Sequence, residues 1–300
     1  MRILITGATG FIGRMLCSSF KAKGDELCIL TRKTRLAKQR LPLKGLRFIQ
    51  SLEEIQNDEY FDVVINLAGA PISKRWTNAY KKTILQSRLG LTKALVGLFS
   101  RLVHKPSVFI SGSAIGYYGP QEGQPLNEES GFTSSFSHDL CAAWESEALK
   151  APAGIRVCLL RTGIVLGANG GALAQMRLPF LLGLGGPFGD GKQWMSWIHM
   201  VDMVRLVHFC IENQAISGPI NATAPLPVIN RDFVKTYAKV LRRPCFLTTP
   251  AWVLELVYGQ MALELLLTGQ KVLPEKLTTA GFSFIYPSLE IALIAINQEH

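Results

Sequence analysis

Three glycines spaced three residues apart give the clearest chemical signal in the sequence. They belong to Gly7-Ala8-Thr9-Gly10-Phe11-Ile12-Gly13, which follows the apolar run 2–6 and precedes a segment whose apolar residues recur at helical spacing. Such a turn lets the backbone approach a pyrophosphate, and the start of the helix presents free N–H groups to it. A tight strand–helix turn is the simpler explanation of the glycines, but the flanking strand and helix favour dinucleotide binding. The expected contacts are Gly7, Thr9, Gly10, Phe11, Ile12 and Gly13.

The end of the second expected strand, residues 26–31, selects between the two nicotinamide cofactors. NAD-binding proteins place an Asp or Glu about 20 residues beyond the glycines to hold the ribose 2′-OH. This chain has Thr31, Arg32 and Lys33 at that place. A guanidinium can grip the 2′-phosphate of NADP in a forked geometry, and the neighbouring hydroxyl and ammonium add to it. We therefore expect NADP(H) as the cofactor.

The formal net charge of +10 is concentrated beside this position. Seven basic residues and no acidic ones lie in residues 32–47, so the remainder of the chain has an ordinary charge. A nucleic-acid surface would interleave aromatic residues with these charges, and only Phe48 stands at the edge of the segment. We expect the NADP phosphate to explain Arg32, and residues 38–47 to form a solvated basic loop.

A second candidate contact follows the apolar run 62–67. Asn66-Leu67-Ala68-Gly69 ends this strand at the carboxyl edge of the expected sheet, where ligands of such folds lie. Small residues there would let the adenosine ribose pass closely, so Leu67, Ala68 and Gly69 are candidate cofactor contacts. A plain strand-to-loop exit is the alternative.

These motifs together resemble the short-chain dehydrogenase/reductase superfamily, in its extended, epimerase-like branch. The resemblance rests on T-G-x-x-G-x-x-G at 6–13, N-L-A-G at 66–69, the serine at 113 and L-R-T-G-I-V-L-G at 160–167. Residues 185–191 and 193–199 (Gln-Trp-Met-Ser-Trp-Ile-His), with 269–274 and 280–282, are similar to the atypical NAD(P)-binding "epimerase family protein" group. That group carries a C-terminal domain of unknown function, and the resemblance covers essentially the whole chain.

The resemblance implies further cofactor contacts. The family's dinucleotide contacts fall on the glycine turn, on Thr31 and Arg32, and on Leu67 and Ala68. They extend to Arg88, in the helix after that strand, and to Ile164. A surface arginine is the alternative for Arg88.

The expected catalytic machinery departs from the family pattern. Related enzymes use a serine, then Tyr-x-x-x-Lys about 25 residues later, with the tyrosine as acid and base. Ser113 fits the serine, but Cys141 and Glu145 stand where the pair is expected. A glutamate would raise the pKa of a neighbouring acid, the wrong direction for a phenolate base. Tyr117 and Tyr118 are candidate sources of a phenol, with substrate contact or packing as alternatives.

Alternating strands and helices predict an α/β fold, a doubly wound parallel Rossmann sheet of the extended type with a smaller C-terminal α/β lobe. We expect residues 1–165 to form the NADP-binding domain, with 195–225 returning to it. Residues 166–194, which are rich in glycine and loose in pattern, and 226–300 would form the substrate-side lobe.

Composition excludes several other classes. The chain has 300 residues, of which 48% are hydrophobic and 18% charged, so it can bury a core and is not disordered. It has no uninterrupted apolar window long enough for a membrane helix and no signal-peptide pattern. Its scattered cysteines and histidines predict no metal site and fit a reducing cytoplasm.

Two functions remain open. The first is an NADP(H)-dependent oxidoreductase or epimerase-like enzyme that acts on a small substrate, possibly a nucleotide sugar. The second is a non-catalytic NADP(H)-binding sensor or regulatory protein, because the Tyr-x-x-x-Lys pair is absent. We expect a small-molecule partner and neither nucleic acid nor a membrane as partner; the oligomeric state is not readable from the sequence.

Overall fold

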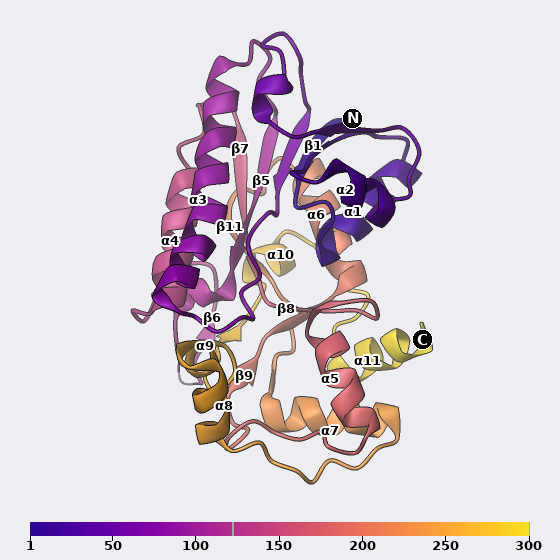
Figure 1. The fold of residues 1–300 in the computed structure, drawn as a ribbon, viewed down its shortest axis with the longest axis vertical. Coiled ribbons are helices and arrows are strands. Elements are labelled where there is room, and N and C mark those ends of the chain that lie inside the picture. Colours follow the sequence, from indigo (N-terminus) through magenta and orange to yellow (C-terminus); the bar gives the residue numbers. More distant parts are fainter. Residues whose placement is uncertain (122, 300) are drawn as a thin grey trace.

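A seven-stranded parallel sheet organises the chain in the computed structural model, which describes residues 1–121 and 123–299 (Figure 1). The strand order is β11-β7-β5-β4-β1-β2-β3, and every neighbouring pair is parallel. The strands are β1 (Arg2–Thr6), β2 (Glu26–Leu30), β3 (Leu46–Ile49), β4 (Val63–Asn66), β5 (Val108–Ala114), β7 (Arg156–Thr162) and β11 (Gly218–Ala222). The order reverses between β1 and β4, which is the point where ligands of doubly wound folds bind.

Helices cover both faces of this sheet, as the fully buried strands require. One face carries α1 (Phe11–Ala22) and α6 (Met200–Glu212), and the other carries α3 (Asn78–Arg101) and α4 (Phe136–Ala148), which run side by side (Figure 1). A separate apolar cluster fills each face. Within the described residues, none of the helices combines the length and the apolar character needed to cross a membrane.

The parallel register brings the ends of the strands together. Thr6 at the end of β1 lies opposite Leu30 of β2 and Asn66 of β4. Ser113 near the end of β5 lies opposite Arg161 of β7, which in turn pairs with Asn221 of β11. The candidate cofactor and catalytic residues therefore share one edge of the sheet.

A second group of elements lies beyond that edge, in the lower half of Figure 1. A third apolar cluster, which includes Trp197, Phe233 and Leu293, fills its interior. Its elements are β8 (Ile164–Leu166), α5 (Gly171–Leu181), β9 (Trp194–Met195), β10 (Trp197–His199), β12 (Val228–Ile229), α7 (Asn230–Leu241), α8 (Ala251–Tyr258), α9 (Gln260–Leu265) and α11 (Leu289–Gln298). The short β6 (Pro125–Leu126), β13 (Lys271–Val272) and α10 (Glu275–Thr279) connect it to the sheet domain.

Two segments are more regular than the sequence indicated: residues 38–47 were expected to form a loop, and no helix was expected in the glycine-rich stretch 166–194. Residues 34–40 form the helix α2 (Thr34–Arg40) and residues 46–49 form β3, so the basic segment is not a solvated loop. Ala37 and Leu41 are buried between its charges, and this sparse apolar spacing was hidden by the basic side chains. In the glycine-rich stretch, α5 forms because Leu173 and Phe180 bury one side of it in the third cluster.

Candidate functional site

The glycine turn between β1 and α1 is built almost entirely of backbone. Gly7 has a φ of +71°, and a Cβ on it would lie 2.6 Å from the carbonyl carbon of Leu67. A Cβ on Gly13 would overlap the carbonyl oxygen of Gly7. The Gly10 amide donates to that same oxygen at 2.9 Å. The turn therefore has room only for glycine at these positions, and it leaves its outer side free for a phosphate.

A buried polar network fixes the second candidate segment against this turn. The Thr6 hydroxyl donates to the Asn66 side-chain oxygen at 2.7 Å and accepts from the Ala68 amide at 3.3 Å. The Asn66 side-chain amide donates to the Thr92 hydroxyl of α3 at 2.9 Å. The structure thus brings Leu67 and Ala68 into contact with Gly7, as one surface at the carboxyl edge.

Residues after β8 approach the other side of the turn. Gly170 and Gly171 lie so close to the Phe11 ring that a Cβ on either would overlap it. Arg14 of α1 donates to the Asn169 carbonyl oxygen at 3.2 Å. Ile164, at the start of β8, donates its amide to the Ser196 carbonyl oxygen at 2.9 Å. The segment 164–171 therefore leads from the end of β7 to the start of α1.

The basic residues after β2 lie beside the turn because Leu30 pairs with Thr6. Arg32 and Lys33 are exposed, and the Thr31 amide is held by the Ile49 carbonyl oxygen at 2.9 Å. Within residues 1–121 and 123–299, no carboxylate lies within ion-pair distance of Arg32. Its charge is thus available to an anion bound at the turn.

Arg88 of α3 is half-buried behind Gly69. A Cβ on Gly69 would lie 2.8 Å from the guanidinium carbon, and this carbon stacks 5.2 Å above the Trp144 ring. Burial lowers the pKa of Arg88, and in the described part of the chain no carboxylate pairs with it. Its guanidinium donates a hydrogen bond to the Ile84 carbonyl oxygen at 3.3 Å. A desolvated cation without a counter-ion is costly, so an anion or several oxygen atoms at this edge would stabilise it.

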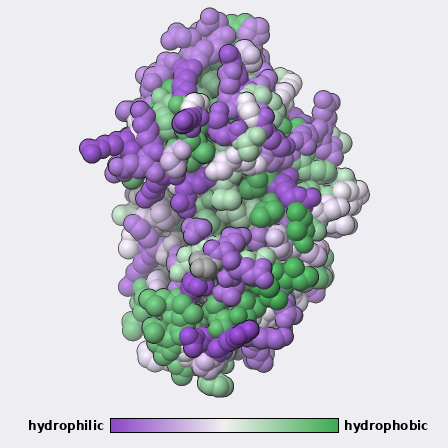
Figure 2. Space-filling view, turned by 90° about the vertical axis from the view of Figure 1, so that its right-hand side faces the viewer, coloured by the Kyte–Doolittle hydropathy of each residue, from purple (hydrophilic) through white to green (hydrophobic). Residues whose placement is uncertain are grey.

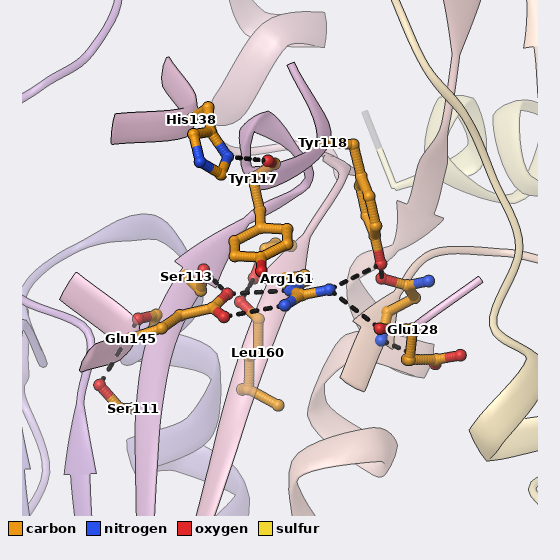
Figure 3. A network of polar contacts seen from close by, with 12 residues as sticks. Ser111, Ser113, Tyr117, Tyr118, Glu128, His138, Glu145, Leu160 and Arg161 are labelled. Carbon is orange, nitrogen blue, oxygen red and sulfur yellow. Dashed lines mark hydrogen bonds and ion pairs between the residues drawn. The ribbon is translucent and has the colours of Figure 1, made fainter. Parts of the chain in front are cut away.

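The structure joins Ser113, Glu145 and Arg161 in one buried unit (Figure 3). The Ser113 hydroxyl donates to Glu145 Oε1 at 2.6 Å. Arg161 forms a forked pair with the same carboxylate, Nε to Oε1 and Nη2 to Oε2, both at 2.9 Å. Burial lowers the pKa of Arg161, but its hydrogen bonds and attraction to Glu145 outweigh this and raise it. The pair therefore joins α4 to β7 at the position where the family's lysine was expected from the sequence.

The two tyrosines of the loop η2 (Ile115–Tyr118) differ in their surroundings (Figure 3). Tyr118 is fully buried; its hydroxyl donates to the Asn221 side-chain oxygen at 2.7 Å and accepts from Arg161 at 3.1 Å. Burial raises the pKa of Tyr118 to about 12, which opposes a role as base at neutral pH. Tyr117 is half-buried, and its ring lies 3.4 Å from the Arg161 guanidinium carbon. Of the two, Tyr117 is the phenol nearer to solvent.

Cys141, at the family's tyrosine position, is a protonated thiol. It lies buried on α4 one turn before Glu145, and burial raises its pKa to about 12. The nearby Glu145 charge acts in the same direction. Thiolate chemistry is thus disfavoured here, because a reactive cysteine needs a lowered pKa.

His199 lies between the sheet domain and the second group of elements. It is buried, caps α6 by accepting from the Val201 amide at Nδ1 (3.1 Å), and packs on the Tyr286 ring at 3.8 Å. Burial lowers its pKa to about 4, although Asp202 opposes this. A proton on Nδ1 would also break the cap. The neutral ring therefore belongs to the folded state.

This histidine predicts acid sensitivity. Its folded pKa lies below its unfolded value of 6.5, so the unfolded chain binds the proton first as the pH falls. The contribution of the neutral His199 ring to the free energy of unfolding is therefore intact above pH 6.5. As the pH falls from 6.5 toward 4, protonation of the unfolded chain lowers the free energy of unfolding by about 3 kcal/mol in total. Urea unfolding measured between pH 6.5 and 4 should show a smaller decrease in the free energy of unfolding for His199→Asn than for the wild type. The exposed His104→Asn should follow the wild type, and equal slopes for His199→Asn and wild type would contradict the assignment.

The pairing of Glu145 with Arg161 was missed by sequence reasoning. Arg161 was considered only as part of the L-R-T-G-I-V-L-G motif, and Glu145 only as the residue in place of the family's lysine. A usable signal existed: Arg161 directly follows the apolar run Val157–Leu160, and a buried arginine requires a buried carboxylate. Glu145 meets that need from the helix before β7.

Comparison with known proteins finds relatives that match nearly the whole chain. The profile of the NAD dependent epimerase/dehydratase family matches residues 3–222, and that of a domain of unknown function (DUF1731) matches residues 249–296. The epimerase family protein SDR39U1 homolog, chloroplastic, of Arabidopsis thaliana is 40% identical over 99% of this chain and 87% of its own length. The epimerase family protein YfhF of Bacillus subtilis is 39% identical over 98% of this chain and 97% of its own.

A solved structure agrees with these relatives. The crystal structure of human epimerase family protein SDR39U1 with NADPH has a TM-score of 0.91 and 32% identity, and the match covers all of both chains. The Rossmann fold with its C-terminal extension is therefore confirmed over the full length.

Proposed function

Because the chain belongs to the NAD dependent epimerase/dehydratase family, we propose that it binds NADP(H) at the carboxyl edge of its sheet and reduces or oxidises a small substrate there. One observation carries the proposal: the glycine turn at Gly7–Gly13, closed against Leu67 and Ala68, stands beside the exposed Arg32, which has no carboxylate partner among the residues that the structure describes. The related human protein was crystallised with NADPH, which supports the same cofactor here.

The residues of this edge fit such a cofactor. The N–H groups at the start of α1 would hold the pyrophosphate, and Arg32 with Thr31 and Lys33 would hold the 2′-phosphate. Leu67, Ala68 and Gly69 would line the path of the adenosine ribose. Arg88, desolvated and without a carboxylate, would bind oxygen atoms of the cofactor from behind Gly69.

The cofactor would supply the hydride, and the chain would orient the substrate. Ser113 donates its hydrogen bond to Glu145, so its oxygen is free to accept a hydrogen bond from a substrate hydroxyl. Tyr117 is the phenol available as the proton donor or acceptor. Ile164, just beyond β7, would contact the nicotinamide end. Ser113 and Tyr117 are therefore our candidate catalytic residues. We propose the cytoplasm as the location of the protein, because its scattered cysteines fit a reducing compartment.

A second candidate, a non-catalytic NADP(H) sensor, is favoured by one specific observation. The tyrosine and lysine of the family are replaced by Cys141, a neutral buried thiol, and by Glu145, which is fully engaged with Arg161. Neither of these groups can exchange a proton with a substrate in the usual way. NADPH labelled with deuterium would separate the candidates, because transfer of the label to any carbonyl substrate excludes the sensor.

The cofactor proposal predicts a specific loss in Arg32→Ala. NADPH affinity should fall by about ten- to a hundredfold, the cost of a charge-assisted contact, while NADH affinity stays the same. Titration calorimetry with both cofactors measures this. Arg40→Ala, exposed on the same basic segment, is the matched control and should bind as the wild type does. Equal binding of NADPH and NADH by the wild type would contradict the proposed role of Arg32.

A further inference from the structure

An exposed apolar surface lies at the end of the molecule remote from β3 and the N-terminus. Figure 2 shows a broad hydrophobic area at the lower end, at the height where Figure 1 places α5, α7 and α8. Phe246 is 85% exposed and Trp252 67%. We call the following residues the apolar surface: Leu178, Leu182, Leu184, Phe246, Leu247, Trp252 and Leu256. All of them are more than half exposed, which is rare for side chains of this size gathered in one region.

Backbone contacts show that the two segments bearing these residues lie side by side. Gly183 packs against the Pro244 ring, and a Cβ on Gly186 would overlap the Leu247 carbonyl oxygen. Phe188 pairs with Thr249 in an isolated β-bridge. Trp252 and Leu256 are one helical turn apart on α8, so they share a face. The surface is therefore continuous across α5, the loop before α8, and α8.

The charged residues around this surface are mostly basic, with exposed acidic residues at Asp190, beside Lys192, and at Glu255. Residues 178–189 and 244–254 contain no charged side chain. Arg242 and Arg243 are exposed at one border, and Arg75 lies beside Gly259 at the far end of α8, next to the exposed Lys74. Glu255 is the one acidic residue on α8. An apolar centre with a basic border and exposed Trp and Phe side chains matches the surface of an anionic bilayer.

A second copy of the chain fits this surface less well. A twofold contact would bring the same surface of each copy together, and with it the exposed Arg242 and Arg243 at the border of each copy. A bilayer with anionic headgroups instead attracts these charges and accepts the aromatic side chains at its interface.

We propose that the apolar surface docks onto an anionic phospholipid membrane, with Trp252 and Phe246 inserted at the interface and Arg242 and Arg243 at the headgroups. This proposal does not depend on the cofactor proposal, since the surface lies outside the glycine turn and the Ser113 unit. It replaces the expectation from the sequence that a membrane is not a partner, because docking at a membrane surface requires no spanning helix.

Vesicle binding by the full chain tests the proposal. The wild type should co-sediment with vesicles of phosphatidylcholine mixed with phosphatidylglycerol. It should not co-sediment with vesicles of pure phosphatidylcholine. Arg242→Gln with Arg243→Gln should weaken binding about thirtyfold, because each basic residue near an anionic surface strengthens it about fivefold. Phe246→Ser with Trp252→Ser should weaken it more than about tenfold. Val103→Ser, which removes another 67% exposed apolar residue far from this surface, is the control and should bind normally.

Tryptophan fluorescence gives a second measurement that shows which side chain enters the bilayer. Brominated lipids should quench the wild type much more than Trp252→Phe, because Trp76, Trp144 and Trp197 are buried and Trp194 is half-buried beneath Lys271. Binding by the double serine variant equal to that of the wild type would overturn the proposal. A second result would also overturn the proposal: the wild type forms a dimer, the double serine variant is a monomer, and neither protein binds vesicles. The apolar surface would then contact a second copy of the chain.

Discussion

Arg161→Met is expected to lower the free energy of unfolding by about 3–5 kcal/mol, which is the usual cost of breaking a buried ion pair from one side. Arg161 and Glu145 are only 3% and 6% exposed in their side chains, so the glutamate would be left as an uncompensated buried charge. Ser113 would then be its remaining partner in the unit. Denaturant unfolding followed by circular dichroism measures the loss.

Two variants make this result interpretable. Lys239→Met breaks an exposed pair with Glu290 and should leave unfolding unchanged within error. Arg161→Met combined with Glu145→Leu removes both charges and should recover much of the stability. If the single Arg161 variant were as stable as Lys239→Met, the pair would not be the buried unit that the geometry describes.

Gly13→Ala is expected to weaken NADPH binding by about a hundredfold or more. The new Cβ would overlap backbone atoms of Gly7 and Ala8, so the turn must shift away from the position in which it can receive a pyrophosphate. Displacements of about 1 Å are enough for losses of this size. Titration calorimetry measures the affinity, and circular dichroism verifies that the variant is folded.

Gly90→Ala is the matched control for this experiment. Gly90 lies exposed within α3, where a Cβ would meet nothing within 4 Å. Alanine there should leave NADPH binding unchanged and raise the free energy of unfolding by about 1 kcal/mol, since glycine is a poor helix former. Unchanged NADPH binding in Gly13→Ala would mean that the turn is not the phosphate site.

The sheet could be predicted because its strands are short apolar runs, and the segments between them have apolar residues at helical spacing. Val63–Asn66 and Val108–Ala114 are buried on both faces, and such strands give the same signal wherever they occur. Thr34–Arg40 gave no such signal, because its buried residues are few among basic ones and its helix depends on packing against the sheet domain. The helix α5 gave no helical signal for a different reason: it contains an internal proline and begins among glycines.

The candidate site could be predicted only where its chemistry is local. The glycine turn and Thr31–Lys33 are defined by neighbours in the chain and by one strand pairing. The unit of Ser113, Glu145 and Arg161 joins β5, α4 and β7, and the forked geometry of the pair depends on how α4 packs over the sheet. No spacing rule along the sequence encodes that packing, so the glutamate was seen only as a missing lysine.

The Glu145–Arg161 pair also restricts how this active-site edge can change in evolution. A mutation of Glu145 to the lysine of related enzymes would place two cations together in a buried space that now holds one of each sign. A tyrosine at Cys141 alone would gain no neighbouring cation to lower its pKa, because Arg161 is already neutralised by Glu145. Each of these substitutions is therefore unfavourable without the others. An engineer who wished to introduce the common catalytic pair here would have to make several substitutions together.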